Sequence, residues 1–362
     1  MPVDFSTERW ARIRENSRRW WAGQLKRPLI HQVGHGRDPG RPAPRAHPMR
    51  KARFYDFSLS ADDIVDGWDY RLSSLKFLGD SFPCVWPDFG PGVLAAYLGA
   101  RTEVRDKENT VWFGGEPTPD IARLRFAYRP DAPLAVRLRE IYRAALRRWN
   151  GLVQLGMTDL GGNLDVLASF RPGEQLLLDL SDSPREVERL TWEAHEAWFR
   201  CFEDFDAILR PVNPGHTAWT PIFSGEPYYM LQCDFAYMIS PQMFDKFVRP
   251  ELAASCRRLV NPFYHLDGKG QLPHLDSLLS IPELKGVQWI PGDGQPGITH
   301  WPHVYRKIRA AGKLTQIFGG PRELDTIADQ LGSAEGIIQI GGFDLKREKE
   351  MEKFLSRYGA LE

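Results

Sequence analysis

The sequence has 362 residues, of which 42% are hydrophobic and 26% charged, a composition typical of a globular enzyme with a sizeable core. Its 47 acidic and 47 basic side chains balance, which argues against nucleic-acid or anionic-membrane partners held by bulk charge. The cysteines Cys84, Cys201, Cys233 and Cys256 form no CxxC pair, so neither a disulfide framework nor a zinc ribbon is expected. The opening MPVDFSTERW lacks an apolar signal region, and no run approaches the ~20 apolar residues of a membrane span; we expect a cytoplasmic protein.

The first part of the chain combines a helical segment, a strand and an irregular loop. Residues 8–27 mix basic side chains with Glu8 and Glu15, a pattern typical of a solvated helix face. The run PLIHQV (28–33) predicts a first strand, and FPCVW (82–86) predicts a later one. Segment 34–50 is rich in glycine, proline and arginine, so we expect a long surface loop that acts as a lid or an oligomer contact.

From about residue 150, short apolar runs alternate with helical patterns. Strands are expected at 152–160, 216–223, 228–235, 262–266, 286–290, 314–318 and 336–340. Helices are expected at 165–170, 183–205, 240–259, 272–280, 301–311, 321–331 and 345–357. The Ser-Pro pairs that open two of these helices, at 183–184 and 240–241, each supply an N-cap followed by a first-turn proline.

This order of elements favours a TIM (β/α)8 barrel. Strands as apolar as these are buried on both faces, as in a parallel sheet. A regular βα repeat without a hairpin signal gives either a barrel or a doubly wound sheet. No G-x-G-x-x-G follows a strand, which counts against a dinucleotide site. We predict a barrel over residues 61–362, with the helix, first strand and loop of residues 1–60 as an N-terminal extension of the same domain.

Candidate functional residues follow from the barrel, because its βα loops converge on one mouth at the carboxyl ends of the strands. The sequence has no G-x-S-x-G elbow, P-loop or HExxH helix, which argues against hydrolase, kinase and zincin classes. Residues with chemical functions that directly follow the apolar runs are Asp88, Asp159, Asn163, His216, Trp219, Cys233, Asp234, His265, Asp267, Asp293, Gln316 and Gln339.

The stretch YHLDGKG (264–270) is the strongest candidate in this set. His265 and Asp267 are two residues apart on a strand, so both side chains point to the same side, which suits a metal or a proton-transfer pair. The alternative is structural: the aspartate caps the next helix and the histidine bonds a backbone carbonyl.

The other candidates each have a structural alternative as well. Cys233 is a possible metal ligand, although a cysteine in an apolar strand is usually a small buried hydrophobe. Asp159 and Asp234 precede helices and can serve as N-caps, and Asp88 precedes the tight turn FGPG. The expected catalytic residues are Asp88, Asp159, Asp234 and Asp267; the expected substrate-binding residues are Asn163, Trp219, Gln339 and Arg37; the expected metal ligands are His265, Asp267 and Cys233. Aromatic walls can come from Trp86, Trp219, Tyr228 and Trp289.

Four segments together resemble the uroporphyrinogen decarboxylase superfamily, which includes zinc-dependent, cobalamin-linked methyltransferases. They are GGNLDVLASFRPGEQLLLDLSDSPREVERL, QCDFAYMISPQMFDKFVRPEL, YHLDGKGQLPHLDSLLSIPELKGVQWIPGDG and GIIQIGG, and the resemblance spans roughly residues 75–360. It implies a TIM barrel and places His265 at a zinc-ligand position of the methyltransferases, where Asp267 replaces a thiolate. The last thiolate of those enzymes falls near Ile340, Gly341 and Gly342, where no ligand exists. The arginine signature of the decarboxylase is absent from PLIHQVGHGRDPGR.

Three functions are compatible with the sequence. The first is metal-assisted methyl transfer between a small substrate and a corrinoid or folate carrier, with zinc or another divalent metal at His265 and Asp267 and a possible corrinoid protein partner. The second is a decarboxylase or lyase without cofactor, in which Arg37, Arg41 or Arg45 clamps substrate carboxylates. The third is a non-catalytic barrel that binds a small ligand or a corrinoid protein. A homodimer is ordinary for this fold.

Overall fold

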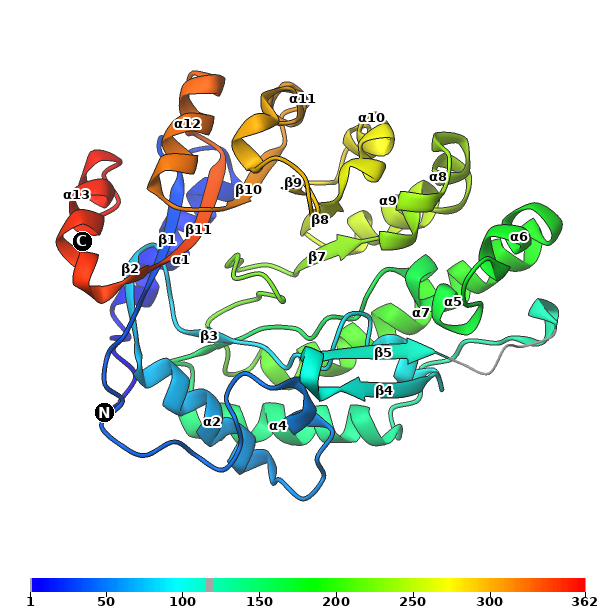
Figure 1. Cartoon of the computed structure of the whole chain (residues 1–362), viewed down its shortest axis with the longest axis horizontal. Helices are drawn as coiled ribbons and strands as arrows, with labels where there is room; N and C mark the ends of the chain where they lie inside the picture. The colour runs from blue at the N-terminus through cyan, green and yellow to red at the C-terminus, as the bar shows by residue number, and fades with distance from the viewer. Residues whose placement is uncertain (1, 115–119, 362) are drawn as a thin grey trace.

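The computed structural model describes residues 2–114 and 120–361, which form a mixed α/β fold around a mostly parallel sheet (Figure 1). The sheet has seven strands in the order β2-β1-β11-β10-β9-β8-β7, and its neighbours are parallel except for the antiparallel pair of β1 and β2. In that order they are β2 (Leu75–Gly79), β1 (Leu29–His35), β11 (Ile337–Asp344), β10 (Leu314–Phe318), β9 (Gly286–Ile290), β8 (Asn261–Asp267) and β7 (Tyr228–Gln232).

Two smaller sheets complete the strands. The pair β3 (Cys84–Val85) and β6 (Gln154–Leu155) is parallel, and β4 (Arg101–Arg105) and β5 (Thr110–Gly114) form an antiparallel hairpin. Within the described residues no ladder joins the β3–β6 pair to the larger sheet. One link is a side chain: the Tyr229 hydroxyl of β7 accepts from Leu160 N at 2.7 Å and donates to Thr158 O at 3.1 Å, beyond β6. The parallel α/β architecture is confirmed, whereas closure into an eight-stranded barrel stays a prediction.

Helices flank the strands. They are α1 (Arg9–Trp21), α2 (Ala61–Ser73), α3 (Leu94–Tyr97), α4 (Pro133–Trp149), α5 (Asn163–Phe170), α6 (Gln175–Asp182), α7 (Pro184–Leu209), α8 (Pro241–Phe247), α9 (Arg249–Arg258), α10 (Leu275–Leu279), α11 (Pro302–Ala310), α12 (Pro321–Leu331) and α13 (Glu348–Arg357). Figure 1 shows α8 to α13 along the outer side of the larger sheet and α2, α4 and α7 beside β3. Among the described helices, none has the length and apolar character needed to cross a bilayer.

The predicted strands differ from the observed ones in several places. Residues 216–223 form no strand; Pro221 lacks an amide donor, and the segment folds back so that His216 bridges Ser224 in antiparallel fashion. Strands β2, β4 and β5 lie where no strand was predicted, and β4 and β5 pair through a turn that ends at Asn109, which adopts a left-handed φ of 50°. The expected irregular loop is present between β1 and α2, and the helix expected at 240–259 is divided into α8 and α9.

Helix α1 covers the end of the fold where the parallel strands begin. The Trp10 indole donates to Leu152 O at 3.1 Å, two residues before β6, and Trp20 stacks on Phe263 of β8 with ring centroids 6.1 Å apart. The Trp21 indole donates to Phe223 O at 2.9 Å. Since this end is filled by tryptophans, the carboxyl ends of the strands are the end left for ligands.

A buried ion pair fixes the connection between α1 and β1. The Asp80 side chain is 2% exposed and accepts from both terminal nitrogens of Arg27, at 2.6 and 2.9 Å. It also accepts from Asn16 Nδ2 at 2.9 Å and from Ile30 N at 3.0 Å. This carboxylate therefore satisfies donors from the helix, the linker and the strand together.

Asp80→Ala is expected to lower the free energy of unfolding by roughly 3–5 kcal/mol, because it leaves the Arg27 charge without its partner in a mostly buried position. Urea unfolding followed by circular dichroism measures the change. Arg18→Ala, which removes an exposed pair with Glu15 on the same helix, is the control and should change stability by less than about 1 kcal/mol. Equal losses in the two variants would contradict the role given to Asp80.

Candidate functional site

The carboxyl end of β8 brings a histidine and two carboxylates together. His265 and Asp267 lie on the same face of the strand, and Asp234 follows the neighbouring strand β7. One ligand atom from each of these three residues lies within 4.8 Å of the other two. This distance fits three ligands of a single metal ion. The two residues singled out on β8 by the sequence thus meet a third candidate, Asp234.

The His265 ring is held in one orientation. Its Nδ1 bonds to Gln288 Oε1 of β9, so Nδ1 carries the hydrogen and Nε2 keeps its lone pair. Nε2 lies 3.7 Å from Asp267 Oδ2. The rings of His265 and Trp219 meet edge to face, with centroids 5.0 Å apart and planes at 90°. The geometry presents an imidazole nitrogen to the two carboxylates, as in histidine ligands of metals whose other nitrogen is hydrogen-bonded.

A chain of glutamines supports the histidine across the sheet. Gln232, His265, Gln288 and Gln316 are register partners on β7, β8, β9 and β10, so their side chains share one face. The Gln288 amide nitrogen donates to Gln316 Oε1. Sequence analysis missed the role of Gln288. The available signal was a single glutamine inside successive apolar strands: Gln32, Gln154, Gln232, Gln288, Gln316 and Gln339.

The surroundings of this cluster are acidic. Burial raises the pKa of Asp159 to about 7, against the lowering effect of the Gly161 N–H that its Oδ1 accepts at 2.9 Å. The charges of Asp234 and Asp88 add to this rise. Desolvation raises the pKa of Asp234 as well, against the lowering effect of the His265 charge, although the Asp234 residue itself is exposed at the surface. For His265, burial lowers the pKa, but Asp267, Asp234 and Gln288 together raise it above its usual value.

Asp165, at the start of α5, orients the segment that carries Asp234. Its two carboxylate oxygens accept from the backbone N–H groups of Asp234 and Phe235, at 3.0 and 2.7 Å. Burial and the nearby charge of Asp234 raise the pKa of Asp165. The preceding Gly161 has a φ of +78°, and an added Cβ would lie 2.6 Å from Gly92 Cα, so this turn requires glycine.

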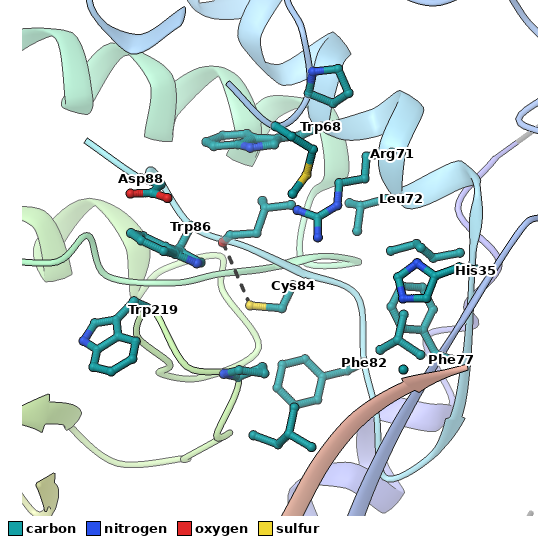
Figure 2. A pocket seen from close by; sticks show the side chains of 18 of the residues that line it. His35, Trp68, Arg71, Leu72, Phe77, Phe82, Cys84, Trp86, Asp88 and Trp219 are labelled. Atoms are coloured by element: carbon teal, nitrogen blue, oxygen red, sulfur yellow. Dashed lines mark hydrogen bonds between the residues drawn. The ribbon is translucent and has the colours of Figure 1, made fainter. Parts of the chain in front are cut away.

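A cavity of about 560 Å³ opens beside the cluster. Trp219 stands between the two: it lines the cavity and also contacts the ring of His265. Figure 2 shows Trp86, Asp88 and Trp219 at one end of the cavity, His35 and Phe77 at the other, and Arg71 between them. The aromatic residues of the wall are Phe54, Trp68, Phe77, Phe82, Trp86 and Trp219. Volume and lining are those of a small-molecule site.

The charged residues of the cavity differ in their pairing. Lys51 forms an ion pair with Asp88, and Asp88 also accepts from Gly90 N at 3.2 Å. Arg53 donates to His47 O at 2.6 Å and stacks over Phe54 and Trp68. Arg71 from the last turn of α2 also lines the cavity. None of these cations was singled out by the sequence, because they lie well beyond the end of β1 and not directly after an apolar run.

The glycines at the end of β11 explain why no ligand stands there. An added Cβ at Gly341 would lie 2.5 Å from Gly319 O and 2.8 Å from Gln339 Nε2. At Gly342 it would lie 2.9 Å from His35 Nε2. Such distances are too short for a side chain, so both positions instead form part of the cavity wall.

Several expected site residues lie elsewhere. Cys233 is buried in the core; since Gln232 faces His265, the next side chain faces away, and the thiol is outside the three-residue cluster. Arg37 is outside the cavity, bonded to Pro2 O and Ser73 O at 3.3 and 3.4 Å. Gln339 is buried, accepts from Gln32 at 3.0 Å and donates to Gly319 O; it does not line the cavity. Asn163 is buried at the start of α5, also away from the cavity.

Other candidates have structural roles. Arg41 pairs with Asp66, and Arg45 donates to Ser58, so neither clamps a ligand in the cavity. His216 bonds Asp206 at 3.0 Å, and Asp293 is exposed. Of the expected aromatic walls, Trp86 and Trp219 line the cavity, whereas Tyr228 and Trp289 are buried in the core.

Comparison with known proteins supports the fold. A methyltransferase from Methanosarcina mazei aligns with a TM-score of 0.61 over 96% of this chain and 99% of its own, at 13% sequence identity. Macrophomate synthase aligns over 62% of this chain and 73% of its own, at 12% identity and a TM-score of 0.23. No family model and no curated protein matches the sequence. The chain thus shares its overall fold with a methyltransferase.

Asp159→Asn is expected to stabilise the protein at pH 8 and to have little effect near pH 4. Between pH 3.8, its unfolded pKa, and about pH 7, its folded pKa, the carboxyl group keeps a proton in the folded state that it has lost in the unfolded state. The free energy of unfolding therefore falls as the pH rises through this range. The neutral amide of the variant still accepts the hydrogen bond from Gly161 N but does not titrate. It therefore avoids this decrease in the free energy of unfolding, which amounts to at most roughly 4 kcal/mol. Thermal unfolding from pH 4 to pH 8 checks this, and a gain that is independent of pH would contradict it.

Proposed function

We propose that this protein is a methyl-transfer enzyme of the uroporphyrinogen decarboxylase superfamily that uses a divalent metal ion. The observation that carries the proposal is the grouping of Asp234, His265 and Asp267, with ligand atoms within 4.8 Å of one another, beside an aromatic-walled cavity. The shared fold with a methyltransferase supports the reaction class. The carrier that gives or accepts the methyl group is, by the same resemblance, a corrinoid protein or a folate.

The residues at the cluster fit a metal ion. One imidazole nitrogen and two carboxylates make a mixed nitrogen and oxygen donor set, which suits zinc, manganese or iron rather than a thiolate-selected metal. The electrostatics also fit. Asp234 has a raised pKa for which burial is the main cause and the charge of Asp267 a further one, so a cation there would offset both. Lys51 does not supply this positive charge, because it is already paired with Asp88.

When bound, the metal supplies Lewis acidity, which activates a substrate oxygen or sulfur for methyl transfer. The protein's own side chains orient the ligands and handle protons. Gln288 fixes the His265 tautomer, and Asp165 holds the backbone that carries Asp234. Asp159, with a pKa of about 7, can hold or release a proton near neutral pH. Trp219 connects the substrate cavity with the ligands.

One observation favours a second function, a decarboxylase or lyase without cofactor. Such a reaction needs a proton donor for a carbanion-like centre, and Asp159 is a buried carboxyl with a pKa raised to about 7. In this alternative, His265 and Asp267 serve only as a proton-transfer pair. Metal binding separates the two functions, because only methyl transfer as proposed here requires it.

Metal analysis of the purified protein should give about one divalent ion per chain, and His265→Ala should weaken its binding more than about 100-fold. Gln288→Leu leaves all three ligands in place but releases the ring, so affinity should fall about 10–100-fold. Isothermal titration of the metal-free protein with Zn²⁺ and Mn²⁺ measures both effects. His300→Ala removes an exposed histidine and is the matched control, expected to bind as the wild type.

Unaltered metal affinity in His265→Ala would refute the metal site. Loss of metal with unchanged turnover would instead favour the second function. A methyl-transfer assay with a methylated corrinoid or folate carrier then tests the reaction itself in the variants that retain their fold.

A further inference from the structure

Arg71 lines the cavity. It belongs to the last turn of α2, and Figure 2 shows its side chain pointing into the cavity above Cys84. Among the described residues, its guanidinium makes no hydrogen bond or ion pair. Three other arginines with largely buried side chains have carboxylate partners: Arg27 with Asp80, Arg139 with Asp204 and Arg171 with Asp179. A partly buried guanidinium is costly without an anion, so this one is available to an external anion.

The groups around Arg71 do not neutralise it. Burial raises the pKa of the Cys84 thiol to about 12, so it stays protonated beneath the guanidinium. Burial, together with the charge of Arg71, lowers the pKa of His35, which therefore stays neutral. Arg53 adds a second positive charge, and its Nε has no partner among the described residues. The cavity around Arg71 therefore carries a net positive charge, because the one carboxylate in its lining, Asp88, is already paired with Lys51.

The remaining wall is flat and apolar. Trp68, Trp86 and Trp219 with Phe54, Phe77 and Phe82 surround a volume of about 560 Å³, within the usual range for small organic ligands. Aromatic walls favour a planar body, since rings stack or meet edge to face. The guanidinium fork of Arg71 matches the two oxygens of a planar carboxylate, and the otherwise apolar wall favours an anion with a single charged group.

We propose that the cavity binds an aromatic or conjugated monocarboxylate, with its carboxylate on Arg71 and its planar body between the tryptophans. The inference rests on the proposed function in taking this cavity as the substrate site of that reaction. The orientation follows from the positions of Arg71 and the tryptophans. With the carboxylate on Arg71, a planar body that extends toward Trp86 and Trp219 (Figure 2) brings its far end to Trp219, whose ring contacts His265. The reacting group is then the substituent farthest from the carboxylate.

The test compares a carboxylate with its neutral amide. Metal-free wild-type protein is titrated calorimetrically with trans-cinnamate and with trans-cinnamamide. Cinnamate should bind at least about tenfold more tightly, since only it forms a charge-assisted pair with Arg71. Arg71→Gln should weaken cinnamate binding at least about tenfold and leave the amide unchanged. Arg147→Gln, which alters an exposed arginine of α4, should bind both as the wild type.

A stability measurement separates binding from a structural role. Because Arg71 has no protein partner, Arg71→Gln should unfold at the same temperature as the wild type or higher, whereas a structural arginine would lower it. Equal binding of cinnamate and cinnamamide, no binding of either, or cinnamate binding unaffected by Arg71→Gln would overturn the proposal. Inorganic phosphate that competes as well as cinnamate would overturn the carboxylate assignment.

Different results would refute the carboxylate site and the metal-dependent methyl transfer. Cinnamate binding through Arg71 in a protein that takes up no metal would sustain the carboxylate site and refute the metal-dependent reaction. Metal bound at His265 in a protein that does not prefer cinnamate would sustain the metal site and refute the carboxylate site.

Discussion

The hydrogen bond between the His265 ring and the Gln288 amide determines what the carboxyl end of the sheet can do. It joins adjacent parallel strands at paired positions, so strand register and ring orientation depend on each other. With Nδ1 occupied, Nε2 faces the carboxylates of Asp267 and Asp234. The amide of Gln288 is in turn held by Gln316. A polar network of this kind, buried within an apolar sheet, specifies one arrangement because any slip in register leaves several groups unpaired.

The site combines a carboxylate-rich cluster with an arginine-bearing cavity, and both bear on the chemistry proposed for it. Carboxylates from the ends of β7 and β8 surround one imidazole, while the cations that line the cavity come from α2 and from the loop before it. One of these cations, Lys51, is paired with Asp88. Tryptophans and phenylalanines make up much of the cavity wall, and charges interact more strongly where such walls exclude water.

Much of the architecture could be predicted from hydrophobic runs, and the pairing of His265 with Asp267 followed from the period of two along a strand. Other features depend on tertiary arrangement that one sequence does not display. Cys233 lies outside the three-residue cluster because it alternates with Gln232, and which of the two would face His265 depends on a strand register that the sequence does not display. Arg71 and Gln288 were missed for opposite reasons. One lies on a helix that resembles an ordinary surface helix, and the other lies inside an apolar strand that resembles core. Proline at 221 prevented a strand that composition alone favoured.

The glycine pair at the end of β11 limits what a substitution can add there. A side chain at Gly341 would collide with Gly319 O, just beyond β10, and one at Gly342 would displace the His35 ring. A sulfur donor at Gly341 therefore could not be introduced by one substitution, because the backbone at position 319 would have to shift as well. The side chains available at this end of the sheet are those of β8 and of the segment that follows β7.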